Sequence, residues 1–291
     1  MDINYELYKV FYHVANTLSF SEASKQLFIS QSAVSQSIKV LEKKLNQPLF
    51  IRSTKRVQLT PEGEILLKHI EPAMNLIRQG ENQLLEANTL NGGQLRIGAS
   101  DTICRYYLVP YLKEFHRRYP NVHIKVTNQT SIACAKLLES GQVDFAITNY
   151  PNSGLSNTQN VRIIREFKDV FVANDEYKEL KGKTVSLKDL KQFPILMLDR
   201  KSTTSEFLHS MFQRHQLDLV PEIELSSNDL LIDLARIGLG VAFVPDYCIP
   251  ENEHNLFRVQ TEEDLPARQL VVASNESLPI SQAAKQFMEM L

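Results

Sequence analysis

The order of patterns within residues 18–63 is the feature that most constrains the fold of this chain. Two short helical patterns are joined by a tight turn, and a hairpin pattern follows directly. Ser21 is expected to cap the first helix, in which Ala23 and Leu27 lie four residues apart and therefore share one face. The turn between the two helices is predicted over residues 28–30.

The second helix is predicted from Gln31 to about Leu45, with Ser30 as its capping residue. Apolar residues recur along one side at spacings of four, three and four, which predicts a buried stripe of Val34, Ile38, Leu41 and Leu45. The opposite side offers amides, hydroxyls and one cation but no carboxylate, at Gln31, Ser32, Ser35, Gln36 and Lys39. A face of this kind suits the reading of base edges in the major groove of DNA.

A hairpin with a basic tip follows, with strands predicted over residues 49–52 and 57–59. Three cations cluster there: Arg52, Lys55 and Arg56. A helix for bases followed by a basic wing for phosphates is typical of a winged helix-turn-helix. Taken alone, the helix could be a solvated amphipathic helix and the hairpin tip an ordinary charged turn. The combination of turn, carboxylate-free face and basic wing in this order favours DNA binding.

The same segment resembles the LysR-type transcriptional regulators. The matching stretches are residues 23–27 (ASKQL), 30–35 (SQSAVS), 49–52 (LFIR) and 59–63 (LTPEG), with Ile38, Leu41 and Glu42. Ser32 departs from the pattern, since the family often has proline there, but it leaves the helix start intact. The resemblance implies a regulator rather than an enzyme. Such a regulator binds double-stranded operator DNA as a homodimer assembling to a homotetramer, and it responds to a small effector.

The charge distribution agrees with a DNA-binding N-terminal segment. The chain has a net charge of -2, but residues 1–60 contain eight Lys and Arg against four Asp and Glu. The basic segment can meet a phosphate backbone, whereas the acidic remainder cannot bind it broadly. No apolar run approaches the roughly 18 residues of a membrane span, and no signal peptide is visible at the N-terminus. Three cysteines form no disulfide framework, which leads us to expect a cytoplasmic protein with reduced thiols.

A long helix is predicted from Pro61 to about Asn88, because Thr60 can cap it and proline is favoured in the first turn. Its apolar and small residues alternate at spacings of three and four: Gly63, Leu66, Ile70, Ala73, Ile77, Gly80, Leu84 and Ala87. This spacing is typical of a coiled coil, so residues 61–90 are expected to be a dimerisation helix between a DNA-binding domain (1–60) and a third region. Packing on the chain's own next domain is the alternative.

Residues 91–291 read as strands alternating with helices, which predicts an α/β domain with a parallel sheet. Strands are expected over residues 95–99, 122–127, 143–148, 169–173, 194–198, 222–225, 241–244 and 269–273. Helices are expected over residues 106–119, 132–140, 204–215, 229–237 and 280–291. The family resemblance implies a two-lobed, periplasmic-binding-protein-like effector domain, with lobe I over about 93–164 and 268–291 and lobe II over about 165–267.

The expected strand ends are rich in hydroxyl and amide side chains. Ligands of open α/β sheets lie outside the carboxyl ends of the strands, and helix starts favour anions. We therefore expect a polar slot for a small anionic metabolite, with Lys201 or Arg200 as counter-charge. Its expected residues, several of which the family resemblance also implies, are Ser100, Thr102, Thr130, Ser131, Thr148, Lys201, Ser202, Thr203 and Asn228. Ordinary helix capping is the alternative for any one of them.

Other chemistry has little support in the sequence. Cys104 and Cys134 lie near this slot, where a helix start can lower a thiol pKa, but a buried structural thiol is favoured over a redox sensor. No histidine pair has a metal-ligand spacing, and no catalytic motif is present, so we expect no metal site, cofactor or enzymatic activity. A small-molecule binding protein without gene control, and an enzyme with its site in the cleft, remain the competing hypotheses.

Overall fold

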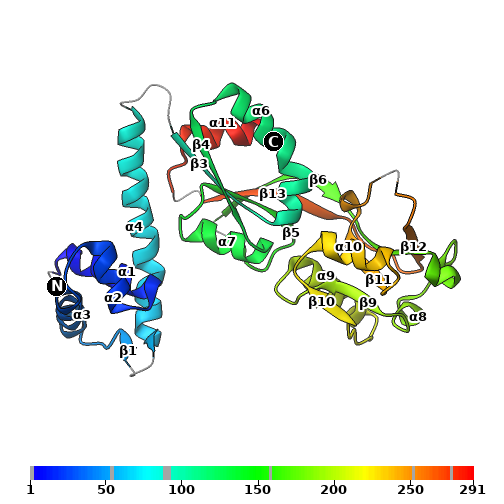
Figure 1. The fold of residues 1–291 in the computed structure, drawn as a ribbon, viewed down its shortest axis with the longest axis horizontal. Coiled ribbons are helices and arrows are strands. Elements are labelled where there is room, and N and C mark those ends of the chain that lie inside the picture. Colours follow the sequence, from blue (N-terminus) through cyan, green and yellow to red (C-terminus); the bar gives the residue numbers. More distant parts are fainter. Residues whose placement is uncertain (1–2, 53–55, 88–92, 157–158, 251–252, 276–277) are drawn as a thin grey trace. The chain divides into compact units, whose positions relative to one another are not determined.

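The chain folds into two compact units (Figure 1). The computed structural model describes residues 3–52, 56–87, 93–156, 159–250, 253–275 and 278–291. One unit comprises residues 1–88 with 140–142, and the other comprises residues 89–139 with 143–291. Among the residues that the structure describes, none of the helices combines the length and the apolar composition of a membrane span.

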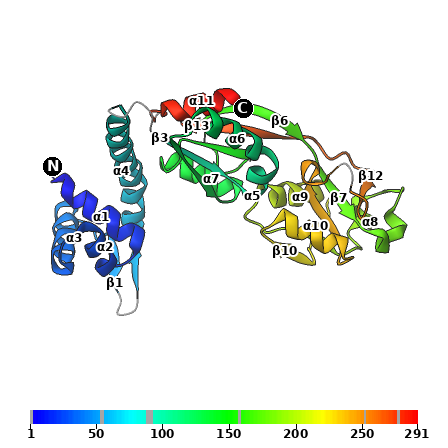
Figure 2. The ribbon, with the colours of Figure 1, turned by 45° about the horizontal axis from the view of Figure 1, so that its top comes forward.

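The N-terminal unit is built on helices that gather beside the first half of a long helix, as Figures 1 and 2 show. The gathered helices are α1 (Tyr5–Thr17), α2 (Phe20–Leu27) and α3 (Gln31–Leu45), and the long helix is α4 (Pro61–Ala87). The stripe predicted on α3 faces their core, where Val34, Ile38 and Leu41 are fully buried with Phe11 of α1. Burial of this stripe fixes which side of α3 remains at the surface.

The helix starts are set by capping side chains. Ser30 Oγ accepts a hydrogen bond from Ala33 N at 3.2 Å, so α3 is capped as predicted. For α2 the prediction is wrong, because Ser19 rather than Ser21 is the cap, and its Oγ accepts from Glu22 N at 3.2 Å. Ser19 has the extended backbone that a cap requires, whereas Ser21 already lies inside the helix.

The hairpin pairs β1 (Phe50–Arg52) with β2 (Val57–Leu59) in antiparallel register. The Thr60 hydroxyl donates to the Pro48 carbonyl oxygen at 2.7 Å and accepts from Gly63 N at 3.0 Å, which starts α4 and ties it to the hairpin. A Cβ added at Gly63 would overlap the Leu49 carbonyl oxygen, so only glycine allows α4 to approach this closely.

The apolar seam predicted along α4 divides into two parts. Leu66 and Ile70 pack on the core of the N-terminal unit, and Gly63 is buried there. Further along the helix, Ile77 and Leu84 are 57% and 71% exposed. The first part of the seam therefore stabilises this unit, and the later part is an apolar stripe at its surface.

The C-terminal unit contains two sheets, each with its helices, which we call the first and second lobes. The sheet of the first lobe has the order β4-β3-β5-β13-β6. Its strands are β3 (Gly93–Ala99), β4 (Val122–Asn128), β5 (Phe145–Tyr150), β6 (Gln159–Phe167) and β13 (Arg268–Asn275). As predicted from the βαβαβ pattern, β3 runs parallel to β4 and β5, whereas β13 is antiparallel to β5 and β6.

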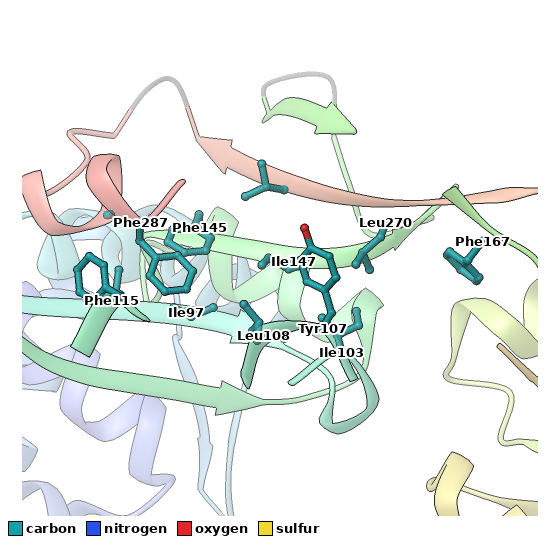
Figure 3. Close-up of a cluster of buried hydrophobic side chains, with 14 residues drawn as sticks. Ile97, Ile103, Tyr107, Leu108, Phe115, Phe145, Ile147, Phe167, Leu270 and Phe287 are labelled. Carbon is teal, nitrogen blue, oxygen red and sulfur yellow. The ribbon is translucent and has the colours of Figure 1, made fainter. Parts of the chain in front are cut away.

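Helices cover both faces of this sheet (Figure 2). They are α5 (Asp101–Ile103), the π-helix η1 (Cys104–Leu108), α6 (Val109–Arg118), α7 (Ser131–Glu139) and α11 (Gln282–Met290). The helix predicted from Tyr106 therefore begins five residues earlier, directly after the first strand. On one face the rings of Phe115, Phe145 and Phe287 meet at centroid distances of 5.2 and 5.7 Å (Figure 3).

The second lobe has a sheet of order β10-β9-β11-β7-β12-β8. Its strands are β7 (Asp169–Ala173), β8 (Thr184–Val185), β9 (Ile195–Leu198), β10 (Ile223–Leu225), β11 (Val241–Pro245) and β12 (Phe257–Thr261). Its helices are η2 (Asp175–Leu180), α8 (Leu187–Leu190), α9 (Thr203–Arg214), α10 (Asn228–Arg236) and η3 (Asp246–Cys248). Side chains of α8 and α9 pack in one buried cluster, and those of α10 pack in another.

The chain crosses between the lobes twice. The first crossing is the single residue between β6 and β7, and the second is residues 262–267 between β12 and β13. The first sheet therefore continues to Phe167, three residues beyond the predicted lobe limit. The sequence analysis missed β6, β8 and β12.

Candidate nucleic-acid interface and ligand pocket

The polar face of α3 lies at the surface of the N-terminal unit. Gln31, Ser32, Gln36 and Lys39 are exposed, and Ser35 between them is half-buried. Residues three and four apart on a helix are neighbours, so these side chains form one continuous surface. It offers donors and acceptors for base edges, and the first turn of α3 contains no acid that would repel phosphate.

The single acid of α3 has a structural role that the sequence analysis missed. Glu42 Oε1 accepts hydrogen bonds from the backbone N–H groups of Leu49 and Phe50 at 2.9 and 3.2 Å. The carboxylate therefore points towards the start of the hairpin and fixes it against α3. In this way one side chain sets the spacing between the candidate reading helix and the wing.

Of the three cations predicted on the wing, the structure describes the side chain of Arg56 alone. Arg56 is exposed just before β2. Arg52 lies at the end of β1, but its side chain falls outside the described residues, as does Lys55 altogether. Their contact with phosphate stays a prediction.

A pocket of about 300 Å³ lies where strand ends of the two lobes of the C-terminal unit face each other. Of the nine residues predicted for the slot, seven line it: Ser100, Thr102, Thr130, Ser131, Ser202, Thr203 and Asn228. Asn128, Gln129, Asn149, Asp101, Asp199 and Ser227 also line it, and each belongs to a strand end that the sequence analysis identified. The rule that ligands lie beyond the carboxyl ends of strands therefore predicted most of the residues that line this pocket.

Helix starts surround the pocket. Thr130, Ser202 and Ser227 cap α7, α9 and α10, and each hydroxyl accepts one backbone N–H at 3.1–3.3 Å. Four N–H groups at each helix start lack an intrahelical partner, so a single cap leaves others available. Together with the helix dipole, these groups favour an anionic or strongly accepting ligand group. Capping and ligand binding are therefore compatible at the same residues.

Two predicted residues lie elsewhere. Thr148 is fully buried in β5 and does not line the pocket, because neighbouring strand residues face opposite sides and Asn149 takes the pocket side. Lys201 is exposed outside the lining, and its backbone N–H donates to Asp199 Oδ1 at 3.0 Å. Arg200, the other expected counter-charge, lines a separate depression with His209.

Side chains connect the two lobes at the rim of the pocket. Asn228 Nδ2 donates to Thr102 Oγ1 at 2.9 Å, and the Tyr106 hydroxyl donates to Asp229 Oδ1 at 2.6 Å. Both contacts join the start of α10 to the segment after β3. Sequence reasoning could not pair these residues, because they are more than 120 positions apart. The contacts hold the two lobes together at the rim of the pocket.

A buried ion pair fixes both crossings between the lobes. Arg268, the first residue of β13, donates from Nη1 to Asp169 Oδ2 at 2.7 Å and to Thr204 Oγ1 at 3.1 Å. Asp169 is the first residue of β7, and Thr204 lines the pocket. The guanidinium also lies over the rings of Phe167 and Phe207, at 5.4 and 5.0 Å from their centroids. A single side chain thus links the two crossings and the pocket.

The cysteines are poorly placed for redox chemistry. Burial, with a smaller contribution from Asp101, raises the pKa of Cys104 to about 11. Burial also raises the pKa of Cys134 to about 12, and all three cysteines are free thiols. The thiolate is the reactive form, so these values favour the structural interpretation over a sensor.

We expect Cys104 to react with iodoacetamide at pH 8 about a hundredfold more slowly in the folded chain than in urea, because a pKa near 11 leaves little thiolate. The modification rate of the folded chain should keep rising about tenfold per pH unit until the pH nears 11, whereas that of the unfolded chain should level off above its ordinary thiol pKa of about 8.5. Peptide mapping by mass spectrometry measures both rates. Equal rates in the folded and unfolded chain would restore the sensor hypothesis.

Comparison with known protein families covers nearly the whole chain. Residues 5–64 match the model of the bacterial regulatory helix-turn-helix protein, lysR family, and residues 88–291 match the LysR substrate binding domain. A probable RuBisCO transcriptional regulator of Trichormus variabilis is 31% identical over 231 residues, which are 78% of this chain and 68% of that protein.

Solved structures share the fold at lower identity. The LysR family regulator CbnR, solved full-length with its target DNA, has a TM-score of 0.65 and 17% identity over 99% of this chain and 98% of that chain. The regulatory domain of Synechocystis PCC6803 CcmR, solved in complex with 2-PG, has a TM-score of 0.62 and 18% identity over 68% of this chain and 95% of that chain.

Proposed function

Because the chain belongs to the LysR family of transcriptional regulators, we propose that α3 and the wing bind operator DNA and that a small metabolite, held in the pocket by its anionic group, modulates this binding. Members of this family are regulators and not enzymes. The observation that carries the DNA-binding part is the exposed, carboxylate-free face of α3. Since its target is chromosomal DNA, we place the protein in the cytoplasm.

The reading helix and the wing have different tasks in this proposal. Gln31, Ser32, Ser35, Gln36 and Lys39 face base edges in the major groove, whereas Arg52, Lys55 and Arg56 hold phosphates. Base contacts confer sequence specificity, and phosphate contacts position the protein and make binding depend on salt. The hydrogen bonds from the hairpin to Glu42 support this division, because they hold the wing at a fixed distance from α3.

Replacing Gln36 by alanine is expected to weaken binding to the preferred sequence by about 1–3 kcal/mol and to relax specificity there. The preferred sequence is found by selecting random duplexes with the full-length wild-type chain. Arg56→Ala serves as the comparison variant: it should weaken all duplexes alike and reduce the salt slope by about one per protomer. If Gln36→Ala binds preferred and random duplexes with wild-type affinities, α3 does not read the groove.

We propose that the chain works as a homodimer that assembles to a homotetramer. The exposed later part of the α4 seam supports pairing of two copies, since Ile77 would be buried between two α4 helices. A dimer presents two reading helices, so its preferred sequence should contain two related half-sites.

The effector part of the proposal rests on the pocket between the lobes. Three helix starts and several hydroxyl groups there can hold the anionic group of a small metabolite. The 2-PG complex of CcmR, a domain of the same fold, supports looking for a small-molecule effector in this chain. Ligand contacts to both lobes would favour one lobe arrangement and so change DNA binding.

A further inference from the structure

The charges around the pocket say more about its ligand than the helix starts alone. This inference rests on the proposed function, because it concerns the effector of the same pocket. Asp101 and Asp199 line the pocket, whereas none of its described lining residues is Lys, Arg or His. Asp199 Oδ1 accepts from Lys201 N, which leaves its other oxygen for a further donor. A ligand that carried only negative charge would face two carboxylates without a cationic side chain to offset them.

Two buried carboxamide groups add unsatisfied acceptors to the lining. Asn149 and Asn228 are 8% and 4% exposed, and Oδ1 of each has no hydrogen-bond partner. Asn228 already uses Nδ2 to donate to Thr102, so its oxygen is the group left over. A buried acceptor without a donor is costly, which makes a ligand that brings N–H groups favourable here.

The lining therefore asks for two different ligand groups. The starts of α7, α9 and α10 offer backbone donors and positive dipole ends to an anionic group. The carboxylates and carboxamide oxygens require a cationic donor on the same small molecule. An α-amino acid carries both groups, and its size suits a pocket of about 300 Å³.

We propose that the effector is one of the twenty common L-α-amino acids, with a free ammonium group. Its carboxylate faces the helix starts, and its ammonium donates to Asp101 or Asp199 and to the carboxamide oxygens of Asn149 and Asn228. An ammonium supplies three donors and a positive charge, whereas the hydroxyl of a 2-hydroxy acid supplies one donor and no charge. The pocket should therefore discriminate between these two classes of ligand.

The test uses the full-length chain and the twenty L-amino acids as probes in calorimetric titrations. At least one should bind, and the 2-hydroxy acid with the same side chain should bind roughly ten- to a hundredfold more weakly, since a hydrogen-bonded charge is lost. L-serine, glycerate and 3-phosphoglycerate form a matched set with increasing negative charge. Equal or tighter binding of the hydroxy or phosphorylated acids overturns the inference, and so does the failure of all twenty amino acids to bind.

Variants separate this inference from the proposed function. At least one of the variants Asp101→Asn and Asp199→Asn should reduce the preference for the amino acid over its hydroxy acid. Asp175→Asn, which changes an exposed side chain, is the matched control and should leave this preference unchanged. If a hydroxy or phosphorylated acid binds instead and Thr102→Val weakens it, the pocket is the effector site and only the zwitterion inference fails. If Thr102→Val and Ser202→Ala leave the affinity of every bound probe unchanged, both proposals for this pocket fail.

Discussion

Replacing Arg268 by methionine is expected to destabilise the C-terminal unit by about 3–5 kcal/mol, because a buried carboxylate then loses its partner. The side chains of Arg268 and Asp169 are only 1% and 0% exposed, so water cannot replace the guanidinium. For a unit of this size, calorimetry of the full chain should show its unfolding temperature lowered by about 10 °C. A shift of less than about 3 °C would show that the pair contributes little.

The double variant Arg268→Met with Asp169→Leu is the matched control. It should recover most of the loss, since no unpaired charge remains buried. In the single variant, burial keeps the pKa of Asp169 above its value in the unfolded chain, as burial already raises it in the native protein. Because Arg268 lowers the pKa of Asp169 in the wild type, the folded variant binds more protons than the folded wild type; its deficit should therefore grow as the pH rises through the folded wild-type pKa of Asp169, which lies above the ordinary value of about 4, and stay small below it. A deficit that is independent of pH would point to lost packing instead.

Introducing Ile77→Glu and Leu84→Glu together is expected to separate the paired α4 helices. The two positions are 57% and 71% exposed in one chain, so the substitutions should spare the fold and act between copies. Four carboxylates would be brought together in the seam of a dimer. Two linked reading heads bind about 10²–10⁴-fold more tightly than a single head, so the affinity for the selected duplex should fall by about the same factor when the helices separate.

Light scattering and DNA titration of the full chain measure the two effects. Lys68→Glu is the control for oligomeric mass, since it introduces the same acid at an exposed position nine residues before Ile77, on the opposite side of α4. Ile70 is unsuitable for this test because it packs on the core of its own unit. Unchanged mass and unchanged DNA affinity in the double variant would rule out the seam.

Local patterns predicted the elements that carry the candidate sites. The spacing of Val34, Ile38 and Leu41 identified the buried side of α3, and hydroxyl-rich strand ends identified most of the pocket lining. Strand β6 escaped prediction because it is an edge strand, with charged residues such as Arg162 and Arg165 among its apolar ones. At that position polar residues face solvent, so the pattern resembles a connection rather than a strand.

Long-range features could not be read from the sequence. Arg268 and Asp169 are 99 positions apart, and no pattern in the residues that flank them in the sequence predicts a fully buried ion pair. Lys201 was expected as a counter-charge because it follows a strand end, but the turn that Asp199 forms with its backbone places it outside the pocket lining. Sequence patterns locate strand ends, whereas the direction of each side chain depends on the local hydrogen bonds.

The coupling between pocket and operator is the central claim, and one pair of titrations tests it most directly. A thermal-shift screen of small metabolites against the full chain supplies the ligand, and selection from random duplexes supplies the operator. The ligand should change operator affinity by about 5–150-fold, and operator DNA must then change ligand affinity by the same factor. An operator affinity that is identical with and without saturating ligand would contradict the account.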